Sequence, residues 1–81
     1  MKVHFEWDEN KREENYKKHG LSFVDCERIF LEPTISFLDD RFNYGETRLI
    51  TLGKLEERVV VIVHTDQESV IRIISMRISK C

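Results

Sequence analysis

The sequence has few of the residues that interrupt or cross-link a chain: its 81 residues include three glycines, one proline and two cysteines. The glycines are scattered, which excludes a glycine-rich phosphate-binding loop. Cys26 and Cys81 lack the spacing of metal ligands, and no Cys/His cluster has zinc spacing. We therefore expect a reduced, cytoplasmic protein without a metal or other cofactor.

Long hydrophobic runs are also missing. The longest, Val59–Val63, has the length of a strand, whereas a membrane helix needs about 20 apolar residues. The N-terminal stretch turns acidic at Glu6 and contains no apolar segment, so we expect neither a signal peptide nor a membrane partner.

What the sequence has in quantity is charge: 35% of the residues are charged and 41% are hydrophobic, with a formal net charge of −2. Residues 1–46 carry a net −4 and residues 47–81 a net +2. This asymmetry predicts one basic face and not a uniformly basic nucleic-acid binder. The length predicts one compact domain over residues 1–81.

Two helices are expected after an N-terminal strand at residues 3–7. The first helix covers residues 9–19, with Asp8 as its N-cap and Gly20 just past its end. The second begins at Ser22 and stops before Pro33. Its buried stripe consists of Phe23, Cys26 and Phe30, with Ile29 beside it.

The remainder of the sequence has the alternation typical of strands. The expected strands are Thr34–Leu38, Thr47–Leu52, Arg58–Thr65 and Ser69–Ile78. Residues 39–45 form a polar loop, residues 54–57 a hairpin connection after Gly53, and residues 66–68 a turn. The fold class is therefore α+β, with the N-terminal strand and two helices packed on an antiparallel β-meander.

Regular alternation along the last strand gives its two faces different compositions. Arg72 shares one face with Val70, Ile74 and Met76, whereas Arg77 shares the other with Ile71, Ile73 and Ser75. An arginine among apolar side chains is costly to bury alone, so Arg72 pairs with an acid or meets an anion. His64 shares the face of Val60 and Ile62, and both a structural and a catalytic role remain open for it.

The polar residues that remain as candidates suit metal-free RNA cleavage. They are Lys18, His19, Arg48, His64, Arg72 and Arg77. In such a reaction a general base takes the 2′-hydroxyl proton, and cations stabilise the phosphorane-like transition state.

Several motifs in order along the chain resemble the BrnT family. They are Trp7-Asp8 with Lys11 and Asn15, Lys18-His19-Gly20-Leu21-Ser22-Phe23, Gly45-Glu46-Thr47-Arg48 through Gly53, and the strands at residues 61–65 and 71–77. The resemblance implies a RelE-like α+β fold and the toxin of a type II toxin–antitoxin module. Such a toxin is a ribonuclease that blocks translation and is neutralised by a BrnA-like ribbon-helix-helix antitoxin, so that it meets DNA only through the antitoxin.

With this resemblance the candidate residues acquire roles. Arg72 and Arg77 would hold phosphate and transition-state charge, Arg48 would position the substrate, and Glu46 or His64 would act as general base. Lys18, His19 and Lys80 would bind RNA, although His19 is as suited to a structural role. On a regular strand Arg72 and Arg77 face opposite sides, so a bulge or a frayed end would be needed to bring both to one face.

The sequence departs from the family pattern at its end, because members commonly continue into a basic segment and a short helix. The sequence stops at Cys81, so we expect activity to be reduced or lost if that segment supplies catalytic side chains. The alternative function is then a shortened, catalytically weak member that acts as a binding module in a toxin–antitoxin repressor complex.

Overall fold

The computed structural model describes residues 3–41 and 45–79. The elements are β1 (His4–Trp7), α1 (Glu9–His19), the 3₁₀ turn η1 (Phe23–Asp25), α2 (Cys26–Phe30), β2 (Ile35–Leu38), β3 (Leu49–Leu55), β4 (Arg58–Gln67) and β5 (Val70–Ile78). The α+β class is confirmed. None of the described helices has the length and hydropathy needed to cross a membrane.

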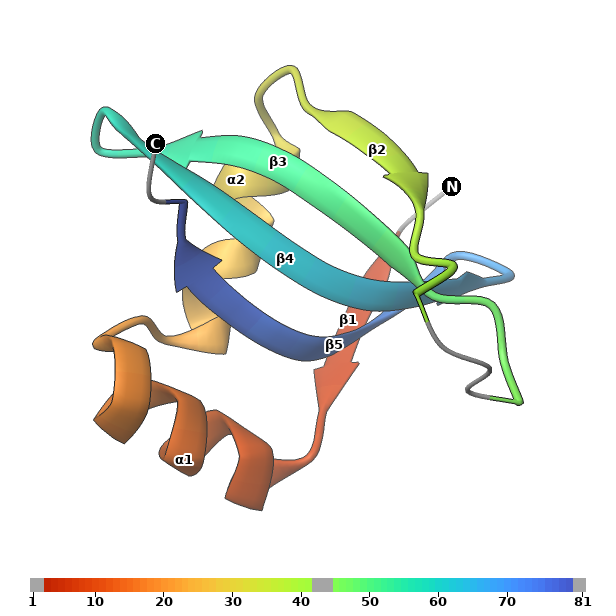
Figure 1. Ribbon diagram of the computed structural model, residues 1–81, viewed down its shortest axis with the longest axis horizontal. Helices are drawn as coiled ribbons and strands as arrows, with labels where there is room; N and C mark the ends of the chain where they lie inside the picture. The colour runs from red at the N-terminus through yellow and green to blue at the C-terminus, as the bar shows by residue number, and fades with distance from the viewer. Residues whose placement is uncertain (1–2, 42–44, 80–81) are drawn as a thin grey trace.

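All five strands form one mixed sheet in the order β1-β5-β4-β3-β2 (Figure 1). Strands β2 to β5 form the expected antiparallel meander, whereas β1 joins the sheet edge parallel to β5. The sequence pattern predicted the strand and the meander, but not that the strand extends the sheet by parallel pairing with β5. The register gives the reason: Phe5 lies beside Ile71 and Trp7 beside Ile73, so this pairing turns both aromatic rings toward the core.

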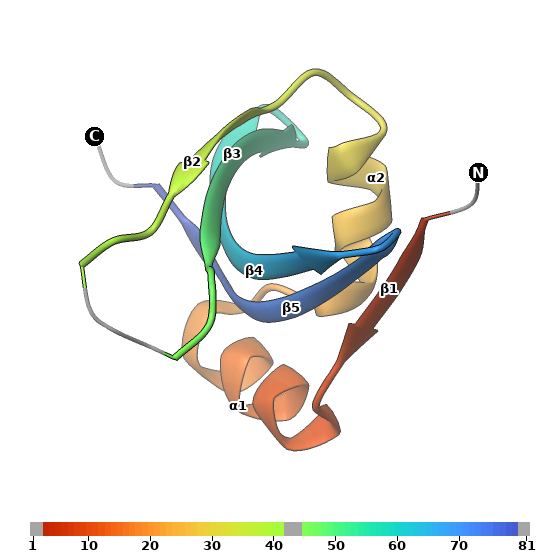
Figure 2. The ribbon, with the colours of Figure 1, turned by 90° about the vertical axis from the view of Figure 1, so that its right-hand side faces the viewer.

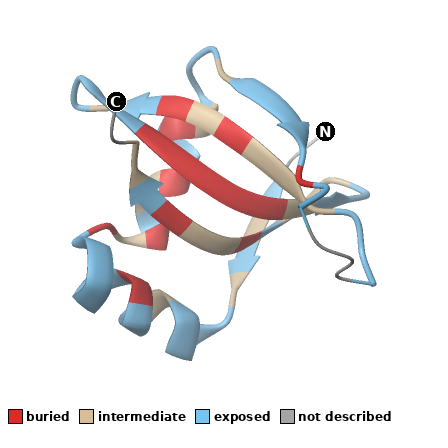
Figure 3. Ribbon diagram, viewed as in Figure 1, coloured by how far each residue is buried: buried red, intermediate tan, exposed pale blue. Residues whose placement is uncertain are grey.

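The core lies between the sheet and the helices, and the sheet curls around α2 (Figure 2). Every residue from Val60 to His64 in the central strand β4 is buried (Figure 3). Phe23, Cys26 and Ile29 have no exposed surface, while Phe30 is only partly buried. The second helical segment starts as a 3₁₀ turn, which rotates each residue further than an α-helix does and brings Ile29 inward.

The limits of α1 follow from its end residues, as predicted. The Asp8 carboxylate accepts hydrogen bonds from the backbone N–H groups of Asn10 and Lys11, at 2.8 and 3.3 Å. Gly20 adopts a φ of +73° and donates its N–H to the Tyr16 carbonyl. A left-handed residue at this place closes the helix.

Gly53 lies inside β3 and does not end it, so the predicted strand limit and hairpin connection are wrong here. A Cβ atom at Gly53 would collide with the side chain of Ile29 and come within 3.2 Å of Thr34 Cγ2. The glycine therefore allows α2 to pack closely on β3. The chain reverses three residues after Gly53, at Glu56 and Glu57, which have φ values of +50° and +67°.

We predict that Glu57→Gly stabilises the protein. A left-handed conformation costs a residue with a side chain about 1–2 kcal/mol, and two-residue hairpin turns favour glycine at such positions. We expect the urea midpoint to rise by an amount equivalent to about 1 kcal/mol, with an unchanged slope. The matched change Glu27→Gly in α2 should lower stability by about 1 kcal/mol; a fall for both variants would contradict the argument.

Candidate functional site

A β-bulge in β5 determines which side chains share the outer face of the sheet. Val63 lies opposite Ser75 and His64 opposite Ile73, so Ile74 has no partner on β4. The expected regular alternation is therefore wrong beyond Ile73. Met76 faces the core instead of sharing a face with Arg72, because the extra residue reverses the side-chain phase.

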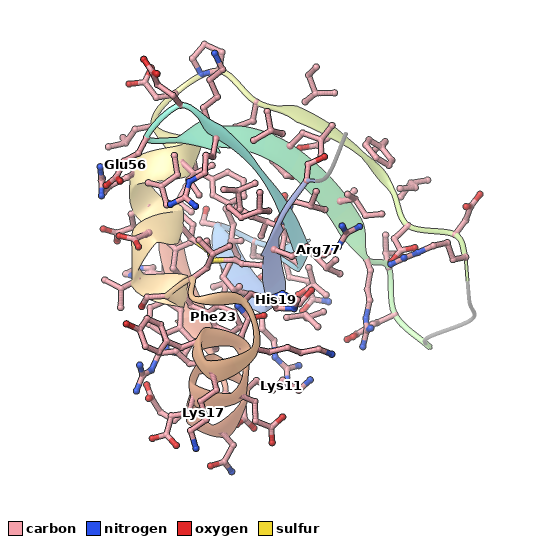
Figure 4. The ribbon with its side chains drawn as sticks, turned by 60° about the vertical axis from the view of Figure 1, so that its left-hand side comes forward. Lys11, Lys17, His19, Phe23, Glu56 and Arg77 are labelled. Carbon is pink, nitrogen blue, oxygen red and sulfur yellow. The ribbon has the colours of Figure 1, made fainter. Side chains whose placement is uncertain are left out.

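The bulge brings Arg72 and Arg77 to one face, the face turned away from α2. Arg72 lies opposite Thr65 and Arg77 opposite Val61, whereas Val60, Ile62 and His64 point to the core. Figure 4 shows Arg77 on the side of β5 away from α2. Both arginines are exposed, and within residues 3–41 and 45–79 neither forms an ion pair. They are two cations available to an anion.

The distance between the two arginines fits a chain of anions better than a single one. Five residues of extended strand separate their Cα atoms by about 15 Å. Successive phosphates of a single strand lying along β5 can each contact one of the two arginines.

An open pocket of about 810 Å³ lies at the end of the sheet where β4 turns into β5. Its lining comes from β1, the segment before β3, β4, the following turn and β5: Glu6, Gly45, Glu46, Thr47, Thr65, Asp66, Gln67, Glu68, Val70 and Arg72. Among the described residues of this lining, Arg72 is the one cation beside four carboxylates. The pocket therefore combines a cation with several potential proton acceptors.

Glu46 and Arg48 form a local acid–base pair. Arg48 Nε donates to Glu46 Oε2 at 3.1 Å, with 22% and 40% of the two side chains exposed. The pair lies just before β3, which begins at Leu49 and not at Thr47 as predicted. The Glu46 carboxylate is thus held near the pocket that contains Arg72.

His64 lies on the opposite face of the sheet from the two arginines. It is 1% exposed, its Nε2 lies 2.6 Å from Thr51 Oγ1, and its Nδ1 lies 2.8 Å from Asp66 Oδ1. Thr51 Oγ1 is also 2.6 Å from Ser36 Oγ. The ring packs edge-on against Phe30.

This chain of hydrogen bonds runs from two buried residues to the exposed Asp66, in the order hydroxyl, imidazole, carboxylate that is found in nucleophilic enzymes. Thr51 and His64 are fully buried, however, so a substrate cannot reach the hydroxyl. Thr51 and Asp66 were not among the predicted site residues. A signal was present, because Thr51 is a polar residue on a strand next to the one that carries His64.

The other predicted RNA-binding residues are Lys18, His19 and Lys80. Lys18 and His19 are exposed in the last turn of α1, one turn after Asn15, which contacts Met76 of β5. Figure 4 shows His19 at this end of α1 and Lys17 pointing outward. Lys80 lies outside the described residues.

Two other kinds of site find no support among the side chains that the structure describes. Burial raises the pKa of the Cys26 thiol to about 12, with Asp25 adding to the effect, so this thiol is not a nucleophile at neutral pH. The described residues contain no group of three or more His, Cys, Asp and Glu side chains that could hold a metal ion.

Comparison with known proteins identifies the family. A comparison with curated proteins gives no significant match. The family model described as "Ribonuclease toxin, BrnT, of type II toxin-antitoxin system" matches residues 7–80, which is nearly the whole chain. The chain therefore belongs to the BrnT family of ribonuclease toxins of type II toxin–antitoxin systems.

Proposed function

We propose that this protein is a toxin that cleaves RNA without a metal ion and thereby inhibits translation in the cytoplasm. The observation that carries the proposal is the pair Arg72 and Arg77, two exposed arginines that the bulge at Ile74 brings to one face of the sheet. Cations spaced along a strand can neutralise successive phosphates of a single-stranded RNA.

In the proposed reaction, the scissile phosphate binds Arg72 in the pocket. A general base removes the 2′-hydroxyl proton, the 2′-oxygen attacks phosphorus, and the bond to the 5′-oxygen breaks as that oxygen receives a proton from water. The products are a 2′,3′-cyclic phosphate and a 5′-hydroxyl end. Arg72 stabilises the charge that develops on the phosphorane-like transition state. Arg48 positions the substrate and also holds the Glu46 carboxylate by a hydrogen bond.

Glu46 is our preferred general base over His64. Glu46 lines the same pocket as Arg72 and keeps 40% of its side chain exposed. His64 is 1% exposed on the other face, and both of its ring nitrogens already have partners. A base must come within hydrogen-bond reach of the proton that it removes, and this condition favours Glu46.

Arg77, Lys18, His19 and Lys80 are proposed to bind the phosphates that flank the scissile one. Arg77 lies further along β5. Lys18 and His19 lie in the last turn of α1, one turn after Asn15, whose side chain binds Met76 of β5. The proposed RNA-binding path therefore runs from the pocket along β5 to the basic end of α1.

A type II toxin has an antitoxin partner. We propose that this partner is a ribbon-helix-helix protein related to BrnA, that the toxin meets DNA only through it, and that the fold is RelE-like. The helices followed by an antiparallel meander support the last point.

The test uses a DNA oligonucleotide with one ribonucleotide and a chelator in the buffer. We expect cleavage at the ribose, a cyclic phosphate product, and loss of cleavage when the 2′-hydroxyl is methylated. Chelation should leave both the rate and the melting temperature unchanged. A stoichiometric metal that is removed together with the activity, or cleavage of the methylated substrate, would contradict the proposal.

A catalytically weak binding module is the second candidate function. The four carboxylates that surround Arg72 in the pocket, and the net charge of −2, oppose strong binding of RNA. A module of this kind would bind the antitoxin with full affinity and leave the ribose-containing substrate intact. Expression in a host without the antitoxin, with Arg72→Ala as the paired variant, separates the two functions by growth arrest.

A further inference from the structure

Two different partners complete the outer edge of β5. Strand β1 pairs with its first part, from Val70 to Ile73. Further on, the Asn15 side chain binds the backbone of Met76: Met76 N–H donates to Asn15 Oδ1 at 3.1 Å, and Asn15 Nδ2 donates to the Met76 carbonyl at 2.9 Å. The Asn15 amide thus takes the place of a peptide group in a neighbouring strand.

Asn15 is well suited to fix this part of β5. It is 8% exposed, and its Nδ2 also donates to the Leu21 carbonyl at 3.4 Å. Because its oxygen accepts and its nitrogen donates, a carboxamide matches both backbone groups of one residue. The helix is thereby tied to the strand at one defined residue, and Figure 1 shows α1 along this half of β5.

The bulge at Ile74 lies between the two anchors. Without it, regular pairing continued from Arg72 and Thr65 would place Arg77 opposite Val60, in the core, and turn Met76 outward. A strand with one unpaired residue can exchange such registers if nothing holds it. Met76 occupies its present position only when the bulge is present, and Asn15 binds it at this position.

We propose that Asn15 is a positioning residue for Arg77: by fixing the Met76 backbone it maintains the bulge and holds Arg77 on the same face as Arg72. The inference rests on the proposed function, since it assigns a residue that arranges the RNA-binding face. Asn15 itself does not touch the substrate.

The experiment is a double-mutant cycle on binding of a 2′-O-methyl RNA that cannot be cleaved. Asn15→Leu keeps the size of the side chain and removes its hydrogen bonds. We expect Asn15→Leu and Arg77→Ala each to weaken binding by about tenfold, as for loss of a hydrogen bond to a charged group. The double variant should bind no more weakly than Arg77→Ala, whereas Asn15→Leu with Arg72→Ala should show the product of both effects.

Matched variants separate positioning from general destabilisation. Ile29→Val also destabilises the protein, but it should leave RNA binding unchanged at a temperature well below unfolding. If Asn15→Leu does not fold, Asn15→Asp replaces it in the double-mutant cycle, because it keeps the acceptor for Met76 N–H and removes the donor to the Met76 carbonyl. A full additional tenfold loss from Asn15→Leu in the Arg77→Ala background would overturn the proposal.

A second measurement keeps this inference apart from the proposed function. In the NMR spectrum, cross-strand contacts between Val61 and Arg77 report the bulged register, and those between Thr65 and Arg72 report the part held by β1. Asn15→Leu should lose the first and keep the second, even if neither arginine proves to bind RNA. Retention of both sets would overturn the positioning role, whereas unchanged binding in Arg72→Ala and Arg77→Ala would contradict only the proposed function.

Discussion

Arg72→Ala should slow RNA cleavage about 100-fold or more while the protein remains folded. Removing one group that stabilises the charge of a transition state typically costs about 10²–10³ in rate. Arg72 is exposed and forms no ion pair with the other described residues, so its loss should change the free energy of unfolding by no more than about 0.5 kcal/mol. Arg72→Lys should give an intermediate rate, because lysine keeps the charge and loses bidentate binding.

The same substitution should weaken binding of the antitoxin. A toxin can be blocked by a partner that covers its cationic site, and Arg72 offers a charge beside the apolar Val70 on the open face. Truncation of a charge that becomes desolvated in a complex costs about 2–5 kcal/mol of binding. Titration calorimetry measures this loss. Lys54→Ala, at an exposed position near the far end of β3, is the control and should affect neither cleavage nor antitoxin binding.

The competing interpretation is that Arg72 has a structural role through an internal acid. Glu46 pairs with Arg48, and Glu6 on β1 is the acid in register with Arg72. Undiminished antitoxin affinity together with a lower melting temperature would show that Arg72 is structural. The site assignment would then be wrong.

Phe23→Ala should have the largest effect on stability. Phe23 is fully buried at the start of the second helical segment, and its ring packs edge-on against Trp7 with centroids 6.2 Å apart. Such a truncation costs about 3–5 kcal/mol. In a domain of this size each kcal/mol lowers the melting temperature by about 4–8 °C, so a loss of more than about 10 °C is expected.

Phe37→Ala provides the matched control for this prediction. It removes the same atoms from β2, at a position that is 49% exposed. Its effect on the melting temperature should be a small fraction of that of Phe23→Ala. Equal effects, or an unchanged melting temperature for Phe23→Ala, would contradict the placement of Phe23 in the core.

Local chemistry made the helices predictable. Asp8 and Gly20 define the ends of α1 because a cap and a left-handed residue act on their immediate neighbours. The parallel pairing of β1 with β5 was not predictable, since it joins residues more than 60 positions apart and depends on how the core closes. The predicted limits of β3 were wrong for a related reason. Gly53 looked like a strand end, but its role is set by its contact with Ile29.

The candidate site also has some features that the local sequence predicts and others that depend on how the strands pair. The pair of Glu46 and Arg48 could be predicted because the two residues are only two positions apart in the sequence. The common face of Arg72 and Arg77 could only be stated as a condition that needed a bulge, because the prediction assumed regular alternation along the whole of β5 and the extra residue was located only by the pairing with β4. The face of His64 was predicted, but its contact with Thr51 required the register between β3 and β4.

The order of strands in the sheet has a consequence for synthesis of the toxin. Strand β5 lies between β1 and β4, although it is the latest of the three along the chain. During translation β1 has no neighbour in the sheet until residues 70–78 have left the ribosome, and Arg72 and Arg77 belong to this same strand. A nascent chain therefore cannot close its core before it carries both arginines. Truncated products that lack β5 should fail to fold, so incomplete synthesis does not yield a partial toxin.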